Sequence, residues 1–247
     1  MGRLLLVRHG QASFGADDYD ELSGLGGEQA RVLGESFARR GIRPDLVLCG
    51  SLRRHAGTVR GILDGLSLEG LSLDGPGDPA IPVTADPGWD EFDFQHVVEI
   101  HQPRYRDRAY LAAELARSDE PGRAFQEIFE AATGRWCSGE NDAEYAESFP
   151  AFRERIAGAL ERAGDLLRQH RDIVAVTSGG PIALAVAMLT AGPKGDPATV
   201  AAMWAALNRV AVNTGVTKLV SGRRGLWMST YNEHTHLESA PRLLTYR

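Results

Sequence analysis

The sequence of 247 residues has only two cysteines, Cys49 and Cys137, which lie far apart. Neither belongs to a pair with the short spacing of a metal or redox motif, so zinc-ribbon and thioredoxin-like sites are excluded. A chain with so few cysteines is typical of a reducing compartment, and we therefore expect a cytoplasmic location.

The chain also lacks long apolar runs and an excess of positive charge. The Ala- and Leu-rich stretch 182–191 is too short to cross a membrane and instead predicts a buried helix. Only four apolar residues separate Arg3 from Arg8, which is not the pattern of a secretory signal. The net charge of −6 disfavours binding to nucleic acids or anionic membranes. We therefore expect no nucleic acid and no membrane as partners.

What the chain does contain is a strand–turn–helix pattern that occurs three times. Ser23 is a suitable N-cap and Gly41 a suitable stop for a first helix, a second helix follows Ser51, and a third begins at or just after Pro181. The three apolar segments before these helices read as buried parallel strands, at residues 4–7, 45–49 and 172–177. Together they predict a three-layer α/β/α fold with a mostly parallel central sheet.

The remaining segments complete the predicted organisation. The Gly- and Pro-containing segment 71–87 predicts a loop with one short strand near 81–84, and the pattern from 94 to about 169 predicts mostly helix, apart from a polar loop at 136–147. We expect a single domain over residues 1–247, with a helical insertion at about 94–150.

The C-terminal part predicts two further strands, at 210–220 and 226–231, joined by a hairpin turn at 221–225. The first of these could be an edge strand that pairs with a second copy of the chain, which would make the protein a homodimer.

The first predicted strand ends abruptly in Arg8, His9 and Gly10. Parallel strands present their last side chains at the carboxyl edge of the sheet, where ligands bind in open α/β folds. There an imidazole can act as a nucleophile and a guanidinium can grip an oxyanion in a bidentate way. Gly10 lets the backbone come close to a ligand.

The other strand ends add groups that favour an anion. Arg54 lies in the first turn of the helix after the second strand, where backbone N–H groups and the helix dipole already favour negative charge. The third strand ends in Ser178, followed by Gly179 and Gly180, whose N–H groups could line an anion pocket. Two arginines and a helix N-terminus predict a phosphoryl site. Residues 87–94 place carboxylates among aromatic residues and a proline, which favours a protonated general acid.

Taken together, these motifs resemble those of the histidine phosphatase superfamily, the phosphoglycerate mutase-like proteins. Arg54 with Thr58 is similar to the family's second phosphate-gripping arginine. The other matching segments are LVRHGQA at 6–12, LSGLGGEQA at 22–30, DEFDF at 90–94 and NEHTHL at 232–237.

The resemblance implies a chemistry and a set of roles. His9 would attack the substrate phosphorus and become a phosphohistidine, and Glu91 would protonate the leaving oxygen. Arg8 and Arg54 would hold the phosphoryl oxygens, so that neither a metal nor another cofactor is needed. The residues expected to line the substrate site are Gly10, Gln11, Ser178 and Gly179.

Two positions depart from the family pattern. Gly50 stands where the family usually has a serine, and Ser51 follows it; Ser178 stands where the family has its second histidine. A serine carries no charge, so we expect a slower phosphatase or a site shaped for a different phosphate ester. The histidines that could supply the missing cation are His55, His96, His101 and His234.

The leading hypothesis is a metal-independent phosphatase acting on a small-molecule phosphate ester or a phosphoprotein. One alternative is phosphoryl transfer of the phosphoglycerate mutase type, and another is a weakly active module that binds a phosphorylated ligand or a protein. A third alternative is a serine hydrolase, with Ser178 as nucleophile and His234 or His236 downstream.

Overall fold

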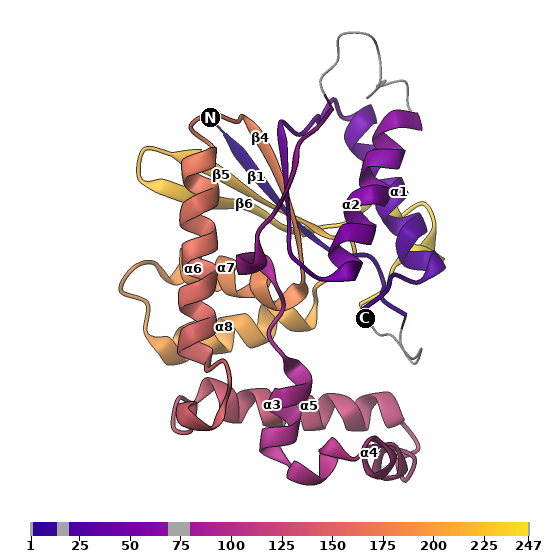
Figure 1. Cartoon of the computed structure of the whole chain (residues 1–247), viewed down its shortest axis with the longest axis vertical. Coiled ribbons are helices and arrows are strands. Elements are labelled where there is room, and N and C mark those ends of the chain that lie inside the picture. Colours follow the sequence, from indigo (N-terminus) through magenta and orange to yellow (C-terminus); the bar gives the residue numbers. More distant parts are fainter. Residues whose placement is uncertain (1, 14–19, 69–79, 247) are drawn as a thin grey trace. The chain divides into compact units, whose positions relative to one another are not determined.

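The computed structural model describes residues 2–13, 20–68 and 80–246 (Figure 1). It divides into two compact units, Met1–Glu91 with Ile156–Arg247, and Phe92–Arg155. The prediction of one domain with a helical insertion at about 94–150 stays a prediction. In the described ranges no helix is both long and apolar enough to span a membrane.

Within the described part of the first unit, six strands form one sheet in the order β3-β2-β4-β1-β5-β6. β1 pairs with β4, β4 with β2 and β2 with β3 in parallel, whereas β5 runs antiparallel to β1 and β6 antiparallel to β5. The strands are β1 Arg3–Arg8, β2 Leu46–Cys49, β3 Val83–Ala85, β4 Asp172–Thr177, β5 Val216–Gly222 and β6 Gly225–Glu233. The predicted mostly parallel sheet is confirmed.

The helices of this unit follow the strands in the predicted alternation. They are α1 Gly24–Arg39, α2 Arg53–Leu68, α7 Gly179–Ala191 and α8 Pro197–Arg209, together with α6 Phe149–Leu166, which begins in the second unit. Short 3₁₀ turns complete the unit: η1 Pro87–Trp89, η4 Thr235–Leu237 and η5 Pro241–Leu243.

The ends of α1 lie where the sequence predicts them. The Ser23 hydroxyl accepts a hydrogen bond from the Gly26 N–H at 3.0 Å and caps the helix. Just beyond the last turn, Gly41 has a φ of +64°, a left-handed conformation that glycine adopts without steric cost.

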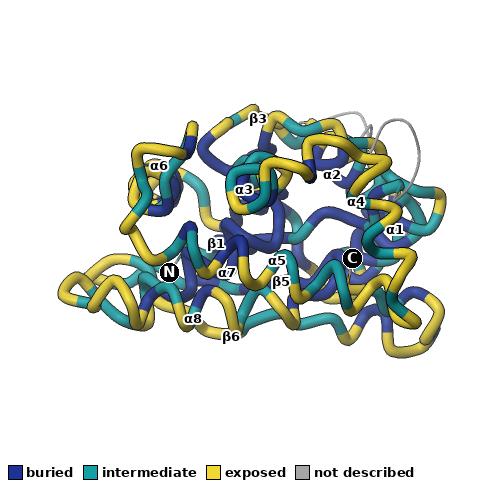
Figure 2. Tube along the Cα trace, turned by 90° about the horizontal axis from the view of Figure 1, so that it is seen from below, coloured by how far each residue is buried: buried dark blue, intermediate teal, exposed yellow. Residues whose placement is uncertain are grey.

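The core lies on both faces of the sheet. Leu5 and Val7 of β1 pack with the inward faces of α1 and α2, while Leu4 and Leu6, which point the other way, are fully buried too. Strands buried on both faces are the rule in parallel sheets with helices on each side. In Figure 2, the trace around β1 and α7 is dark blue accordingly.

Some of the predictions differ from the structure. α7 begins at Gly179, before Pro181, because Ser178 is the extended N-cap residue and the two glycines form the first helical turn. The strand predicted at 210–220 begins at Val216, after α8 and a turn in which Thr214 has a φ of +57°. β5 also lies between β1 and β6, so the prediction that it is an edge strand is wrong. The hairpin turn after Gly222 is confirmed.

The second unit is helical, as predicted. Its helices are α3 Phe94–His101, η2 Pro103–Arg106, α4 Arg108–Leu115, α5 Pro121–Cys137 and η3 Asp142–Glu144, followed by the start of α6. Phe92 stacks on Trp136 with ring centroids 4.7 Å apart, and Phe149 meets the same indole edge-on. Because Trp136 belongs to this aromatic core, α5 continues to Cys137, and the loop predicted from residue 136 begins two residues later.

Candidate functional site

Three parallel strand ends meet at one edge of the sheet. Arg8 at the end of β1 lies opposite Thr177 at the end of β4, and Cys49 at the end of β2 lies opposite Val176. The residues that directly follow these strands are His9, Gly50 and Ser178. The structure therefore brings the predicted motifs together at the carboxyl edge.

His9 is held by its backbone and by both ring nitrogens, and only 6% of its surface is exposed. Its N–H donates to the Thr177 carbonyl at 2.8 Å, and its carbonyl accepts from the Asn213 amide at 3.1 Å. In the ring, Nδ1 lies 2.7 Å from the Gly10 carbonyl oxygen, and Nε2 lies 3.2 Å from Nε of Arg54. A carbonyl only accepts and a guanidinium only donates. The network therefore assigns the proton to Nδ1 and leaves a lone pair on Nε2.

The surroundings of His9 also disfavour its protonated form. Burial lowers the pKa of His9 well below its usual value, and the nearby charges of Arg8 and Arg54 lower it further. The imidazole is therefore neutral at neutral pH, which is the state in which Nε2 can act as a nucleophile.

Arg54 is fixed in the first turn of α2 and is almost fully buried. Behind it, the buried Thr58 hydroxyl donates to the Arg54 carbonyl at 2.8 Å and accepts from the Gly10 N–H at 3.0 Å. Thr58 thus joins the loop after β1 to the first turns of α2 and sets the distance between His9 and Arg54.

Asp20 is a partner of Arg54 that the sequence analysis missed. One of its carboxylate oxygens accepts from Nη1 of Arg54 at 2.7 Å, and the other accepts from the N–H of Arg53 at 2.9 Å. A carboxylate therefore stands at the N-terminus of α2, where an anion is favoured. No local motif marks Asp20, because the contact joins residues more than thirty positions apart.

Arg8 reaches past the strand end toward the C-terminal segment. Its Nη1 donates to the carbonyl oxygens of Ala211 and, at 2.8 Å, of Tyr246. A Cβ atom at Gly179 would lie 3.6 Å from Nε of Arg8, so this guanidinium also borders the start of α7. Arg54 contacts the His9 ring, whereas Arg8 acts on His9 through its charge.

Glu91 lies at the N-terminus of α7, beside the other candidate residues. Its Oε2 atom accepts a hydrogen bond from the Gly180 N–H at 3.1 Å. The preceding 3₁₀ turn is anchored by the fully buried Trp89, whose carbonyl accepts from the Thr177 hydroxyl at 2.5 Å. Trp89 is therefore a core residue that fixes the segment carrying Glu91 to the end of β4.

Gly10 and Gln11 have clear structural roles in this loop. A Cβ atom at Gly10 would lie 2.3 Å from the Gly26 carbonyl oxygen, so only glycine fits against the start of α1. The Gln11 N–H donates to the Gln29 side chain at 2.8 Å, and its own amide oxygen accepts from the Ser23 hydroxyl at 3.2 Å. Their expected contact with substrate stays a prediction.

Of the histidines that could compensate for Ser178, His55 is the one beside it. Its Nε2 atom lies 2.8 Å from the Ser178 hydroxyl oxygen, and its ring centroid lies 5.7 Å from that of His9, with the ring planes tilted by 41°. Both His55 and Ser178 are fully buried. Burial, followed by the charge of Arg54, lowers the pKa of His55 to about 3, so this imidazole is neutral at neutral pH.

The other histidines have different surroundings. His234 contacts the Asn232 carbonyl at 2.6 Å, and His236 contacts the Thr214 hydroxyl at 3.1 Å. His96 and His101 belong to α3 in the second unit. Throughout the described ranges, no three or more His, Cys, Asp or Glu side chains are grouped so that they could hold a metal ion.

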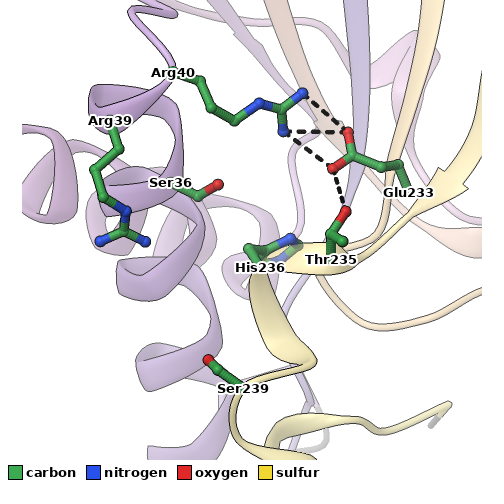
Figure 3. A pocket seen from close by; sticks show the side chains of 7 residues that line it. All are labelled: Ser36, Arg39, Arg40, Glu233, Thr235, His236 and Ser239. Carbon is green, nitrogen blue, oxygen red and sulfur yellow. Dashed lines mark hydrogen bonds and ion pairs between the residues drawn. The ribbon is translucent and has the colours of Figure 1, made fainter.

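A separate pocket of about 400 Å³ lies where the end of α1 approaches the end of β6 and η4 (Figure 3). Arg40 pairs with both carboxylate oxygens of Glu233, and the Thr235 hydroxyl donates to the same carboxylate at 2.8 Å. The lining residues are Ser36, Arg39, Arg40, Glu233, Thr235, His236 and Ser239. None of the residues predicted for the phosphatase site is among them, and His236 belongs only to the serine-hydrolase alternative.

Solved structures with the same fold cover nearly the whole chain. A phosphoglycerate mutase from Bacillus anthracis is 15% identical, with a TM-score of 0.59 over 96% of this chain and 95% of its own. A phosphoserine phosphatase variant from Entamoeba histolytica, in complex with phosphoserine, is 16% identical, with a TM-score of 0.58 over 96% of this chain and 100% of its own. An alpha-ribazole phosphatase from Shigella flexneri is 20% identical, with a TM-score of 0.57 over 94% of this chain and 96% of its own.

The comparison with curated proteins gave no match. The family model of the histidine phosphatase superfamily, branch 1, matches residues 4–223. This range begins in β1 and ends in the hairpin after β5, so it includes all of the strand ends described above. The chain belongs to the histidine phosphatase superfamily, branch 1.

Proposed function

We propose that the protein is a metal-independent phosphatase that cleaves phosphate monoesters through a phosphohistidine at His9. One observation carries the proposal: the unprotonated Nε2 atom of His9 lies 3.2 Å from the guanidinium of Arg54, at the N-terminus of α2. A nucleophilic lone pair beside a cation and a helix N-terminus suits attack on a tetrahedral anion. Membership of the superfamily supports the same reading.

In the first half of the reaction, the phosphoryl group moves from substrate to enzyme. The lone pair of Nε2 forms the N–P bond while the ester P–O bond breaks. The leaving oxygen takes a proton from Glu91, which then carries the negative charge. Arg54 and Arg8 stabilise the charge that develops on the phosphoryl oxygens, in the role that a metal ion has in other phosphoryl-transfer enzymes.

In the second half, water releases the phosphoryl group. The Glu91 carboxylate takes a proton from a water molecule whose oxygen bonds to phosphorus. The N–P bond breaks and its electron pair returns to Nε2, so His9 is neutral again and Glu91 is protonated for the next cycle. The products are an alcohol and inorganic phosphate, and the substrate is a small-molecule phosphate ester or a phosphoprotein.

The geometry argues against the serine-hydrolase alternative. Ser178 does contact an imidazole, but that imidazole is His55, and the serine side chain is fully buried. A carboxylate oxygen of Asp90 lies 3.9 Å from Nδ1 of His55, and the same atom already accepts from the Ser51 N–H at 2.5 Å. A nucleophile needs access to substrate, which the buried Ser178 lacks, and a triad needs a carboxylate bound to its imidazole, whereas Asp90 lies beyond hydrogen-bond distance of Nδ1.

Hydrolysis of a broad panel of phosphate monoesters, assayed with excess chelator, tests the proposal. We expect the wild type to release phosphate from at least one ester, and His9→Ala to be about 10³-fold slower or worse. The matched control is His101→Ala, which removes an exposed histidine on α3. It is expected to leave the rate unchanged. The proposal fails if the folded wild type hydrolyses no ester at any pH, or if His9→Ala keeps the wild-type rate.

A further inference from the structure

His55 is a buried imidazole for which the proposed reaction gives no role. It follows Arg54 directly in α2, has no exposed surface, and places Nε2 within 2.8 Å of the Ser178 hydroxyl. Its ring centroid lies 5.7 Å from that of His9. A buried polar ring is stable only where its neighbours leave space for it and offer it hydrogen-bond partners. The residues around His55 therefore show how the ring is held.

The first neighbour is Gly50, which makes room for the ring. A Cβ atom at position 50 would lie 2.3 Å from Nδ1 of His55 and 2.8 Å from a carboxylate oxygen of Asp90. Any side chain at this position would therefore displace the imidazole. The hydroxyl that the resemblance places at position 50 is found one residue later, where Ser51 binds Asp90 through its N–H and its hydroxyl.

The second neighbour is Ser178, at the end of β4. It is fully buried, and its oxygen already lies at hydrogen-bond distance from the His55 ring. A histidine at position 178 would have to extend its ring beyond the atom that now contacts His55. Two imidazoles would then compete for one buried volume, and well-packed interiors do not absorb such an increase without a shift.

We propose that Gly50, His55 and Ser178 are one coupled set, in which the imidazole packed beside His9 comes from α2 because Gly50 and Ser178 leave room for it. His55 acts as a positioning residue. It packs beside His9, binds the end of β4 through Ser178, and is the next residue in the chain to Arg54. It thereby fixes the contact between Arg54 and Nε2 of His9. Its effect on turnover rests on the proposed function.

A set of four proteins tests the coupling: the wild type, His55→Ala, Ser178→His, and the double variant His55→Ala with Ser178→His. The first readout is kcat/KM with p-nitrophenyl phosphate. The second is the tautomer of His9, read from the ring nitrogen resonances by NMR, which needs no turnover. Melting temperatures confirm that each protein is folded during the assay.

We expect each single variant to lose about 10²-fold in kcat/KM, the cost of misplacing a reacting group. Each should also show a mixture of His9 tautomers. The double variant, with one imidazole and room for it, should return to within about tenfold of the wild type and to a single tautomer, a strong departure from additivity. If the second substitution only improved packing, the double variant would melt at a higher temperature than the single variants but would still show a mixture of His9 tautomers. That result would contradict the inference.

The inference is wrong if Ser178→His alone matches the wild type, or if the losses of the two single variants simply add in the double variant. A folded wild type that shows no turnover contradicts the proposed function. In that event the tautomer of His9 across the four proteins still decides whether the three positions are coupled.

Discussion

Arg54 donates a hydrogen bond from its Nε atom to the Nε2 atom of His9 across 3.2 Å. This contact fixes the tautomer of the imidazole, because a guanidinium cannot accept a hydrogen bond. It also places a permanent cation at the atom where a phosphoryl group would become attached. The same arginine is held from behind by Thr58 and at its far end by Asp20.

The contact predicts that a lysine cannot replace Arg54. A lysine keeps the charge but loses the planar fork, which reaches His9 through Nε and Asp20 through Nη1. We expect Arg54→Lys to lower kcat/KM for a phosphate monoester by about 10²–10³-fold. Arg60→Lys, an exposed position on the same helix, is the matched control. Wild-type activity in Arg54→Lys would show that the Arg54 guanidinium does not hold the phosphoryl group.

Glu91 is predicted to act as acid and base, and the leaving group should reveal this. Glu91→Gln keeps an acceptor for the Gly180 N–H but has no proton to transfer. We expect a loss of about 10²–10⁴-fold with alkyl phosphates, whose leaving oxygen needs a proton, and a smaller loss with p-nitrophenyl phosphate. Steady-state kinetics with both esters measure the difference.

The control for this prediction is Glu161→Gln, which removes an exposed carboxylate on α6. It should leave both rates unchanged. An equal loss with both esters in Glu91→Gln would instead assign Glu91 a role in binding or folding.

Thr58 is predicted to matter for its hydroxyl rather than its shape. Thr58→Val has nearly the same volume but leaves the buried Gly10 N–H without its acceptor. We expect it to reduce the free energy of unfolding by about 1–3 kcal/mol. It should also slow turnover, because the loop that carries His9 loses its tie to α2.

Thr58→Ser retains the hydroxyl and should keep most of both properties. Chemical denaturation and kcat/KM on the two variants provide the comparison. If Thr58→Val keeps the stability and turnover of the wild type and Thr58→Ser does not, the methyl group and not the hydrogen bond is what the site requires.

Buried histidines predict a loss of stability in mild acid. The folded-state pKa is about 3 for His55 and about 4 for His236, both below the 6.5 of an exposed histidine. As the pH falls below 6.5, the unfolded chain therefore binds more protons than the folded protein does. Stability is fully present above that pH and declines below it, by about 1.4 kcal/mol per pH unit for each such histidine.

Urea denaturation at pH values on either side of 6.5 measures this decline. His236→Gln should show a shallower pH dependence than the wild type, whereas the exposed His101→Gln should not differ from it. An unchanged slope in His236→Gln would show that this histidine is protonated in the folded protein.

The meeting of His9, Arg54 and Ser178 was predictable because it follows from topology. His9 and Ser178 directly follow apolar strands, and Arg54 lies in the first turn of the helix after another, and parallel strands align their carboxyl ends. The fold class was predictable for the same reason, since strand and helix periodicities are local properties of the sequence.

Contacts between distant segments were not predictable. Asp20 binds Arg54, and Asn213 binds the His9 carbonyl, through pairings that no spacing reveals. The sequence also did not reveal which of the candidate histidines lies beside Ser178. The position of His55 depends on the space that Gly50 leaves free. The start of β5 was misplaced because residues 210–212 are apolar enough for a strand, whereas residues 211–215 form a buried turn before Val216.

The most direct test of the account is to trap the phosphorylated enzyme. The wild type is mixed with a ³²P-labelled phosphate monoester, quenched within one turnover and analysed by peptide mapping. We predict an acid-labile, alkali-stable label on His9, absent from His9→Ala and longer-lived in Glu91→Gln. A folded wild type that hydrolyses the ester with the label on another residue, or with no covalent label at all, would contradict it.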